Sequence, residues 1–146
     1  MSFNVFHSSP VQGLSVIEPR FSLTHKRLWV YATKSPIMSA PFLSNLGGDL
    51  TCYVGKEIVE NRSFIMERNP GLFDQRYLNK TGSIYMLPGH TFIENQTTWK
   101  EELVSEVAVP VLDEFRVNNV KDFLFHLKEL NLLDIYLIPE DGLLYG

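Results

Sequence analysis

The sequence predicts an α+β fold built mainly from antiparallel strands. Short segments rich in β-branched and aromatic residues recur along the 146-residue chain, and turn-forming residues separate them. Apolar residues at helical spacing are present at only a few places. Because no repeat, low-complexity segment or linker divides the chain, we expect a single domain over residues 1–146.

Several segments carry strand patterns. The opening one alternates apolar and polar residues and ends at the turn-forming Ser8-Ser9-Pro10, while Leu28-Trp29-Val30-Tyr31 is typical of a buried strand. The predicted strands are residues 3–7, 13–19, 28–31, 50–54, 63–67, 83–87, 91–94, 101–109, 115–117 and 135–139. Residues 115–117 are either the hairpin mate of the strand before them or its sequential neighbour. Pro139 places the last strand at a sheet edge.

A helix is predicted directly after the strand at residues 28–31. Thr33 and Ser35 offer side-chain caps, and Pro36 suits the first helical turn. The apolar residues that share one face of this helix are Ile37, Ala40 and Leu43. A sharp turn from strand to helix leaves backbone N–H groups unpaired, so we expect a floor for an anionic or polar ligand there. The residues expected along one side of that floor are Tyr31, Ser39 and Phe42.

Two further helices are expected. Residues 72–78 suit one or two helical turns, and the clearest helix begins after Asn118 or Asn119, either of which can cap it. Its apolar residues recur at three-and-four spacing through Val120, Phe123, Leu124, Leu127 and Leu130.

Composition and charge narrow the class of protein. The net charge of −4 and the absence of a long basic run argue against nucleic acid as the main partner. The lone Cys52 excludes an internal disulfide and fits a reducing compartment. The first residues lack a secretion signal, and no apolar run reaches the roughly 20 residues that span a bilayer. We therefore expect a cytoplasmic protein with no membrane partner.

Several common catalytic motifs are missing. The four histidines lie far apart and no H-E-x-x-H or C-x-x-C occurs, so we expect no zinc site. Gly47-Gly48 and Gly55-Lys56 lack the spacing of a phosphate loop. No serine stands in a G-x-S-x-G elbow, which argues against a hydrolase triad.

Three short motifs follow one another along the chain. Phe6-His7-Ser8-Ser9 closes the first predicted strand, Val30-Tyr31-Ala32-Thr33 precedes Ser39-Ala40-Pro41-Phe42, and Glu102-Leu103-Val104-Ser105 begins a late strand. In these residues the sequence resembles the ADP-ribosyltransferase superfamily, in its diphtheria-toxin and poly(ADP-ribose) polymerase branch with a His-Tyr-Glu triad. The resemblance covers the N-terminal third and the stretch near residue 102.

The resemblance implies a split β core and a reaction. The protein would cleave nicotinamide from NAD, which is consumed as a substrate without a metal, and transfer ADP-ribose to an acceptor. A protein or small molecule is the expected acceptor, and the charge disfavours nucleic acid. The resemblance assigns Glu102 as the catalytic residue. It assigns NAD binding to His7, Ser8, Ser9, Tyr31, Ser39 and Phe42.

Each of these residues has an implied role. His7 would donate a hydrogen bond to the adenosine-side ribose, with support from Ser9. Tyr31 and Phe42 would stack on the two faces of nicotinamide. The Ser39 hydroxyl and the backbone of Ser8 would hold the carboxamide. Glu102 would bind the 2′-hydroxyl of the nicotinamide ribose and stabilise the positive charge that develops as nicotinamide leaves.

Two positions differ from the family pattern, and they leave alternatives open. Ser8 stands where the family has glycine, and Phe42 where it has tyrosine. Glu101 and Glu106 flank Glu102, so the catalytic carboxylate is one of three. The serine at position 8 favours an alternative, a catalytically degenerate member of the fold that binds a nucleotide or protein. A second alternative is an RNA 2′-phosphotransferase-like enzyme, which relies on basic residues that are few near the expected site.

Overall fold

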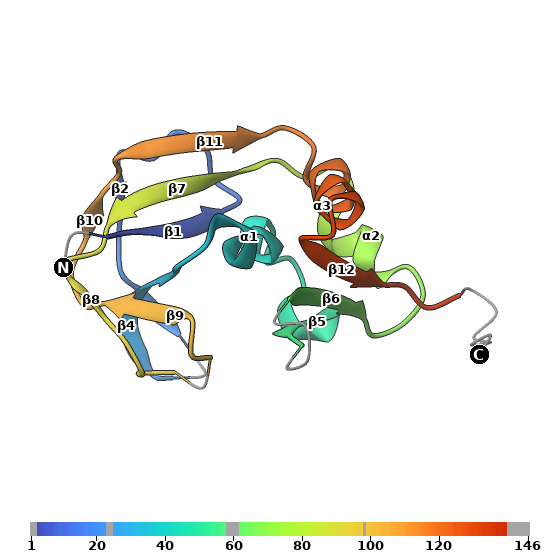
Figure 1. Ribbon diagram of the computed structural model, residues 1–146, viewed down its shortest axis with the longest axis horizontal. Helices are drawn as coiled ribbons and strands as arrows, with labels where there is room; N and C mark the ends of the chain where they lie inside the picture. The colour runs from blue at the N-terminus through green and yellow to red at the C-terminus, as the bar shows by residue number, and fades with distance from the viewer. Residues whose placement is uncertain (1–2, 23–24, 58–61, 98, 140–146) are drawn as a thin grey trace.

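The computed structural model describes residues 3–22, 25–57, 62–97 and 99–139, and these residues form sheets flanked by short helices (Figure 1). The largest sheet has seven strands. Six follow the order β11-β7-β1-β4-β9-β8, and β3 pairs with the N-terminal end of β4. All of its pairs are antiparallel. Its strands are β1 (Asn4–Ser9), β3 (Arg20–Ser22), β4 (Arg27–Thr33), β7 (Gly82–Pro88), β8 (Phe92–Ile93), β9 (Glu102–Ser105) and β11 (Asp113–Val117). The predicted α+β class with mainly antiparallel strands is confirmed.

Two smaller sheets complete the strands. The first has the order β12-β6-β5 and consists of β5 (Cys52–Lys56), β6 (Ser63–Glu67) and β12 (Leu133–Tyr136). β5 is antiparallel to β6, whereas β12 and β6 form the one parallel pair among the described strands. The second is the short pair of β2 (Val16–Ile17) and β10 (Val109–Pro110). The edge position predicted for the last strand is confirmed.

The helices begin where the sequence predicts. They are α1 (Pro36–Ser39), α2 (Leu72–Tyr77) and α3 (Val120–Glu129), with the 3-10 helices η1 (Ala40–Leu43) and η2 (Gly48–Leu50). The hydroxyl of Ser35 caps α1 by accepting from the Ile37 N–H at 3.2 Å, and the Asn119 side chain caps α3. α1 gives way to η1 because Pro41 has no N–H with which to continue the α-helical ladder.

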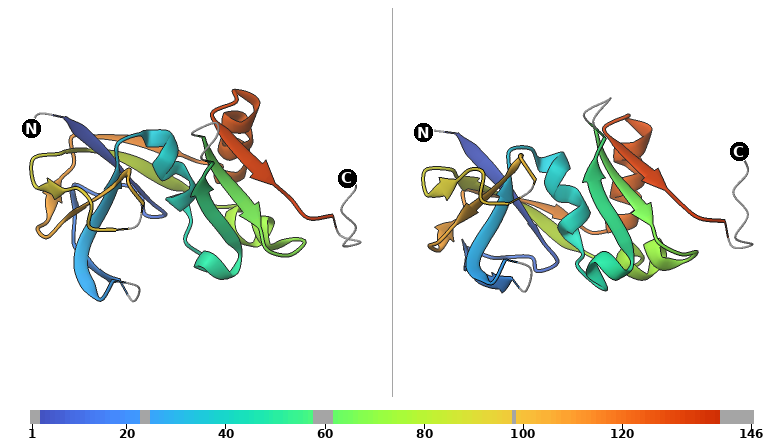
Figure 2. Two further views of the ribbon diagram at one scale, coloured as in Figure 1. Left: turned by 60° about the horizontal axis from the view of Figure 1, so that its bottom comes forward. Right: turned by 90° about the horizontal axis from the view of Figure 1, so that it is seen from below.

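The buried residues connect the two larger sheets. α1 lies between the seven-stranded and the three-stranded sheet in both views of Figure 2. One cluster joins η1 to the three-stranded sheet, α2 and α3, and includes Ala40, Leu43, Ile65, Phe73, Tyr77 and Leu124. The other lies on one side of the seven-stranded sheet and includes Val5, Val30, Ala32, Tyr85 and Leu103. Val30 and Ala32 face this second cluster, so the alternation of a strand turns Trp29, Tyr31 and Thr33 to the opposite face.

Several predicted strand limits, among them those of residues 13–19 (now β2, Val16–Ile17) and 135–139 (now β12, Leu133–Tyr136), and one predicted pairing differ from the structure. β1 extends to Ser9, because residues predicted as a turn pair with β7. The strand predicted at residues 101–109 ends at Ser105, whose hydroxyl accepts from the Val107 N–H and donates to the Val107 carbonyl. The segment at residues 115–117 lies in β11, which pairs with β7 rather than with the preceding strand.

Candidate functional site

One pocket of about 330 Å³ contains every site residue that the sequence predicts. A cavity of this volume is at the lower end of the range for small-molecule sites. The predicted residues in its lining are His7, Ser8, Ser9, Tyr31, Ser39, Phe42 and Glu102. The remaining lining residues are Phe6, Pro10, Val11, Arg20, Ala32, Thr33 and Asn45. The pocket therefore brings together side chains from β1, β4, β9 and the α1–η1 segment.

His7 lies where β1 and β4 meet. The register of these strands joins Phe6 to Thr33, and the His7 Nδ1 atom lies 2.6 Å from the Tyr31 carbonyl oxygen. A carbonyl can only accept, so Nδ1 carries a proton. Burial lowers the pKa of His7; the hydrogen bond to Tyr31 opposes this shift, and the nearby charge of Arg20 adds to it.

The bond to Tyr31 fixes which nitrogen of the His7 ring holds the proton. A lowered pKa favours the neutral ring at neutral pH. Since Nδ1 holds the proton of that neutral ring, Nε2 presents a lone pair. A neutral His7 can therefore accept a hydrogen bond at Nε2 but has no proton there to donate.

Glu102 is placed in the pocket by the pairing of β9 with β4. Glu102 lies directly opposite Thr33, and Val104 lies opposite Tyr31. Directly opposed residues project from the same face of a sheet, so the Glu102 side chain shares a face with Tyr31. Burial raises the pKa of Glu102, while a hydrogen bond from Thr97 and the nearby His25 ring act in the other direction.

The two neighbouring glutamates have other surroundings. Glu101 accepts a hydrogen bond from the Lys56 Nζ at 2.5 Å, and this contact lowers the pKa of Glu101. Glu106 follows the end of β9 and is exposed. Of the three candidate carboxylates, Glu102 is the one in the lining of the pocket.

Tyr31 is held by a small aromatic cluster. Its hydroxyl lies 2.8 Å from the His25 Nδ1, and its ring centroid lies 6.0 Å from that of Trp29 in an edge-on arrangement. Burial raises the pKa of Tyr31, a hydrogen bond with Ser22 opposes the shift, and the charge of Glu102 adds to it. The phenol is therefore neutral, with its ring fixed beside the carboxylate.

The α1–η1 segment supplies two further lining residues, Ser39 and Phe42. The Phe42 ring packs at a tilt on Trp99, with 5.9 Å between centroids. Ser39 is buried, and its hydroxyl donates to the Pro36 carbonyl and accepts from the Ser8 hydroxyl, both at 2.8 Å. Tyr31 and Phe42 thus contribute aromatic rings to one pocket from two different elements.

The floor expected at the strand-to-helix turn is present, but it does not offer the expected donors. Pro36 has no N–H, and the Ile37 N–H donates to the Ser35 hydroxyl. The Ser39 N–H donates to the Ser35 carbonyl at 3.3 Å. These groups are used within the turn itself, so the prediction of free N–H groups for an anion is wrong at these positions.

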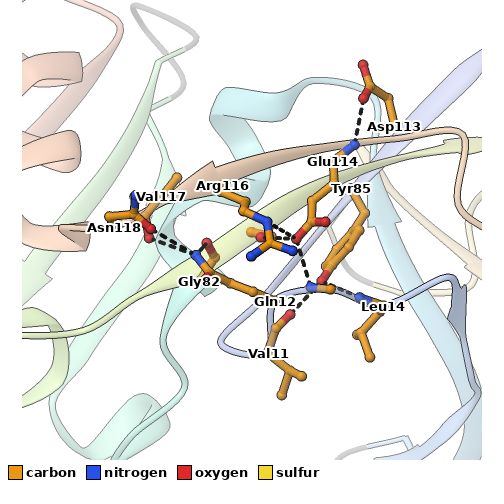
Figure 3. A network of polar contacts seen from close by, with 12 residues as sticks. Val11, Gln12, Leu14, Gly82, Tyr85, Asp113, Glu114, Arg116, Val117 and Asn118 are labelled. Atoms are coloured by element: carbon orange, nitrogen blue, oxygen red, sulfur yellow. Dashed lines mark hydrogen bonds and ion pairs between the residues drawn. The ribbon is translucent and has the colours of Figure 1, made fainter.

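The wall of the pocket formed by Pro10 and Val11 is fixed by a polar network (Figure 3). The Tyr85 hydroxyl donates to the Val11 carbonyl at 2.6 Å and accepts from the Leu14 N–H at 3.1 Å. The Ser9 hydroxyl accepts from the Val11 N–H at 3.1 Å. This network anchors the segment after β1 to β7.

Sequence reasoning missed Arg20 and Asn45. Arg20 is the one cationic side chain among the described residues that line the pocket, and it lies opposite Trp29 in the β3–β4 pair. Opposed residues share a face, so Arg20 projects from the same side as Trp29. Recognising that residues 20–22 pair with residues 27–29 would have revealed Arg20. We find no sequence signal that marks Asn45.

No protein-family model matches this sequence, and no curated protein or solved structure matches it either. Within the described part of the chain, no helix has the length and apolar character needed to cross a bilayer.

Proposed function

We propose that this chain is an NAD-dependent ADP-ribosyltransferase-like protein, which cleaves nicotinamide from NAD and transfers ADP-ribose to an acceptor. The observation that supports it is the convergence of His7, Tyr31 and Glu102, which are far apart in the sequence, in the lining of one pocket.

The aromatic rings suit the nicotinamide. Tyr31 and Phe42 line the pocket from β4 and η1, and each is oriented by a further aromatic neighbour. A planar heterocycle that contacts both rings gains about 1 kcal/mol from each stacking contact beyond its buried area. The ring of a nucleotide cofactor is such a group.

Glu102 suits the chemical step. Cleavage of the bond between nicotinamide and ribose builds positive charge on the sugar, and a fixed carboxylate stabilises that charge most in the transition state. Partial burial strengthens the interaction because water screens it less. The ionised carboxylate is the active form, so the raised pKa of Glu102 predicts that activity increases with pH through that pKa.

Arg20 suits the anionic part of NAD. It is exposed and contributes to the pocket lining, so its guanidinium is available to a pyrophosphate. A single cationic lining residue gives little support to the RNA 2′-phosphotransferase alternative.

The test is release of nicotinamide from NAD by the purified protein, followed by chromatography. We expect release by the wild-type protein and loss of release in the Glu102→Ala and Tyr31→Ala variants. Glu101→Ala is the matched control, because Glu101 is the neighbouring carboxylate and pairs with Lys56 outside the pocket lining. Equal release by Glu102→Ala and the wild type would overturn the assignment.

A catalytically degenerate, nucleotide-binding protein is the second candidate. The observation that favours it is the Ser8 side chain, which is buried in the lining and bonded to Ser39 where the resembled family has glycine. NAD binding without nicotinamide release would support this candidate.

A further inference from the structure

The charged residues of the chain are unevenly distributed. All 17 acidic residues lie outside residues 19–48, whereas that stretch holds four of the 13 lysines and arginines. A protein with a net charge of −4 therefore carries one basic segment, and the hairpin of β3 and β4 belongs to it. Such a separation of charge attracts an acidic partner to one part of the surface.

Two cations of this hairpin have no partner in the protein. Lys26 and Arg27 are exposed at the turn and at the first position of β4, and neither forms an ion pair with another described residue. Lys34, by contrast, pairs with Glu94 at 3.2 Å. Lys26 and Arg27 are thus available to the carboxylates of another molecule.

An exposed apolar pair lies on the other face of the same hairpin. Phe21 and Leu28 stand directly opposite each other, and they are 57% and 61% exposed. Alternation along β4 puts Arg27 on the face of Tyr31 and turns Leu28 to the opposite face. The hairpin therefore presents positive charge on one face and apolar side chains on the other.

The outer edge of β3 is open. Among the described strands β3 pairs only with β4, and β9 pairs with β4 only from Val30 onwards. In both views of Figure 2, β4, drawn in light blue, extends beyond the strands next to it. An open edge presents unpaired backbone N–H and C=O groups, to which an extended segment of another chain can add as a further strand.

We propose that this edge binds an extended segment of a partner protein in which acidic residues alternate with apolar ones. Successive side chains of such a strand point to opposite faces. The acidic side chains lie on the face of Arg27, with Lys26 at the adjoining turn, and the apolar side chains pack on Phe21 and Leu28. The pattern of the partner thus complements that of the hairpin.

This surface is distinct from the candidate site. Phe21, Lys26, Arg27 and Leu28 are all outside the pocket lining, although Arg20 of the same hairpin belongs to it. The docking surface therefore adds to the proposed function and does not depend on it.

Nucleic acid fits this surface less well than an acidic protein segment. Its affinity depends on neutralising several phosphates with cations, and Lys26 and Arg27 neutralise few. The acidic residues outside residues 19–48 repel a long polyanion, whereas a short segment meets the hairpin alone. A phosphate backbone also carries no apolar side chains to pack on Leu28.

The experiment is fluorescence anisotropy of a fluorescein-labelled peptide that alternates glutamate and leucine, titrated with the full chain in the absence of NAD. We expect saturable binding that weakens as salt is added, because salt screens exposed ion pairs. A peptide of the same composition, with its glutamates and leucines in separate blocks, should bind at least ~5-fold more weakly, since it cannot match both faces of the strand.

Two variants locate the binding surface. Arg27→Glu reverses an exposed charge and should weaken binding of the alternating peptide by about 10-fold, and Phe21→Ser should weaken it by about threefold. Arg68→Glu is the matched control, because it makes the same charge change at an exposed arginine that follows β6, and it should leave the affinity unchanged. Thermal unfolding of each variant reports whether the fold is retained.

The outcomes separate this inference from the proposed function. Equal binding of the alternating and block peptides, or equal losses in Arg27→Glu and Arg68→Glu, would overturn the inference. Tighter binding of a single-stranded oligonucleotide with the same label would also overturn it, in favour of nucleic acid. Because these titrations contain no NAD, their result does not depend on whether the protein releases nicotinamide.

Discussion

Two cavities of nearly equal volume share some lining elements, yet their lining residues differ in chemistry. The site pocket measures about 330 Å³, and a second groove measures about 340 Å³. Both take residues from β1 and from the α1–η1 segment, and Phe6 lines both. The groove is lined by Phe6, Pro36, Ile37, Ile84, Met86, Asp113, Glu114, Phe115 and Phe123.

The polar groups of the groove already have partners. Glu114, which is labelled in Figure 3, accepts hydrogen bonds from the Ser83 hydroxyl and the Gly13 N–H. These contacts lower the pKa of Glu114. The Asp113 carboxylate accepts from the Glu114 N–H at 2.9 Å. The pocket instead combines an imidazole, hydroxyls, a carboxylate and a cation around aromatic rings. The pocket and the groove therefore have similar volumes but differ in the chemical character of the residues that line them.

The largest expected effect is on catalysis in the pocket. Glu102→Gln should lower the rate of nicotinamide release by roughly 10²–10³-fold, because it removes the charge that the transition state requires. NAD affinity should change by only a few-fold, since the amide keeps the shape and hydrogen-bonding capacity of the side chain. Steady-state kinetics together with calorimetry separate the two quantities. A variant that keeps more than a tenth of the wild-type rate would place the catalytic group elsewhere.

The next effect is on binding. Tyr31→Ala should weaken NAD binding by about 10-fold or more, since it removes a stacking surface worth ~1 kcal/mol and the apolar area beneath it. Phe123→Ala truncates an aromatic side chain of the groove and should leave NAD affinity unchanged. Comparable losses of affinity in both variants would erase the distinction between the pocket and the groove.

A smaller effect concerns stability and its dependence on pH. The raised pKa of Glu102 means that the folded state holds this proton more tightly than the unfolded state does. The resulting stability is present at low pH and is lost as pH rises through the raised pKa. Glu102→Gln avoids that loss, so its Tm should exceed that of the wild type by a few degrees at neutral pH, given roughly 2–4 °C per kcal/mol. The difference should vanish towards pH 4 in thermal unfolding scans; a Tm below the wild-type value at neutral pH would contradict the burial argument.

The smallest effect is expected at the rim of the groove. Phe115 is 57% exposed, so Phe115→Ser should change the free energy of unfolding by no more than about 0.5 kcal/mol. Nicotinamide release should be unaffected, because Phe115 is outside the pocket lining. Denaturant unfolding and the release assay check both statements, and a large loss of activity would assign the groove a role in the reaction.

Local patterns predicted the elements better than they predicted their partners. The cap of α1 at Ser35 and the cap of α3 at Asn119 depend on residues only a few positions away, and each is one of the two candidates that the sequence offers. The pairing of β11 with β7 depends on contacts between residues about 30 positions apart, which no local pattern encodes. Its prediction as a possible hairpin mate of the preceding strand failed for that reason.

In the candidate site too, local motifs predict the residues but not their distant partners. Motif order singled out residues that do line one pocket, but it left Glu101, Glu102 and Glu106 unresolved. The distinction comes from Lys56, a partner of Glu101 that lies 45 residues away. Arg20 was missed because its position depends on a β3–β4 pairing that the sequence analysis did not include.

The most direct test is a crystal structure of the Glu102→Gln variant with NAD, in which slow turnover preserves the ligand. We predict the nicotinamide ring between Tyr31 and Phe42, with the 2′-hydroxyl of its ribose at residue 102. A dinucleotide bound in the groove beside Phe115, or an empty pocket at saturating NAD, would contradict the account.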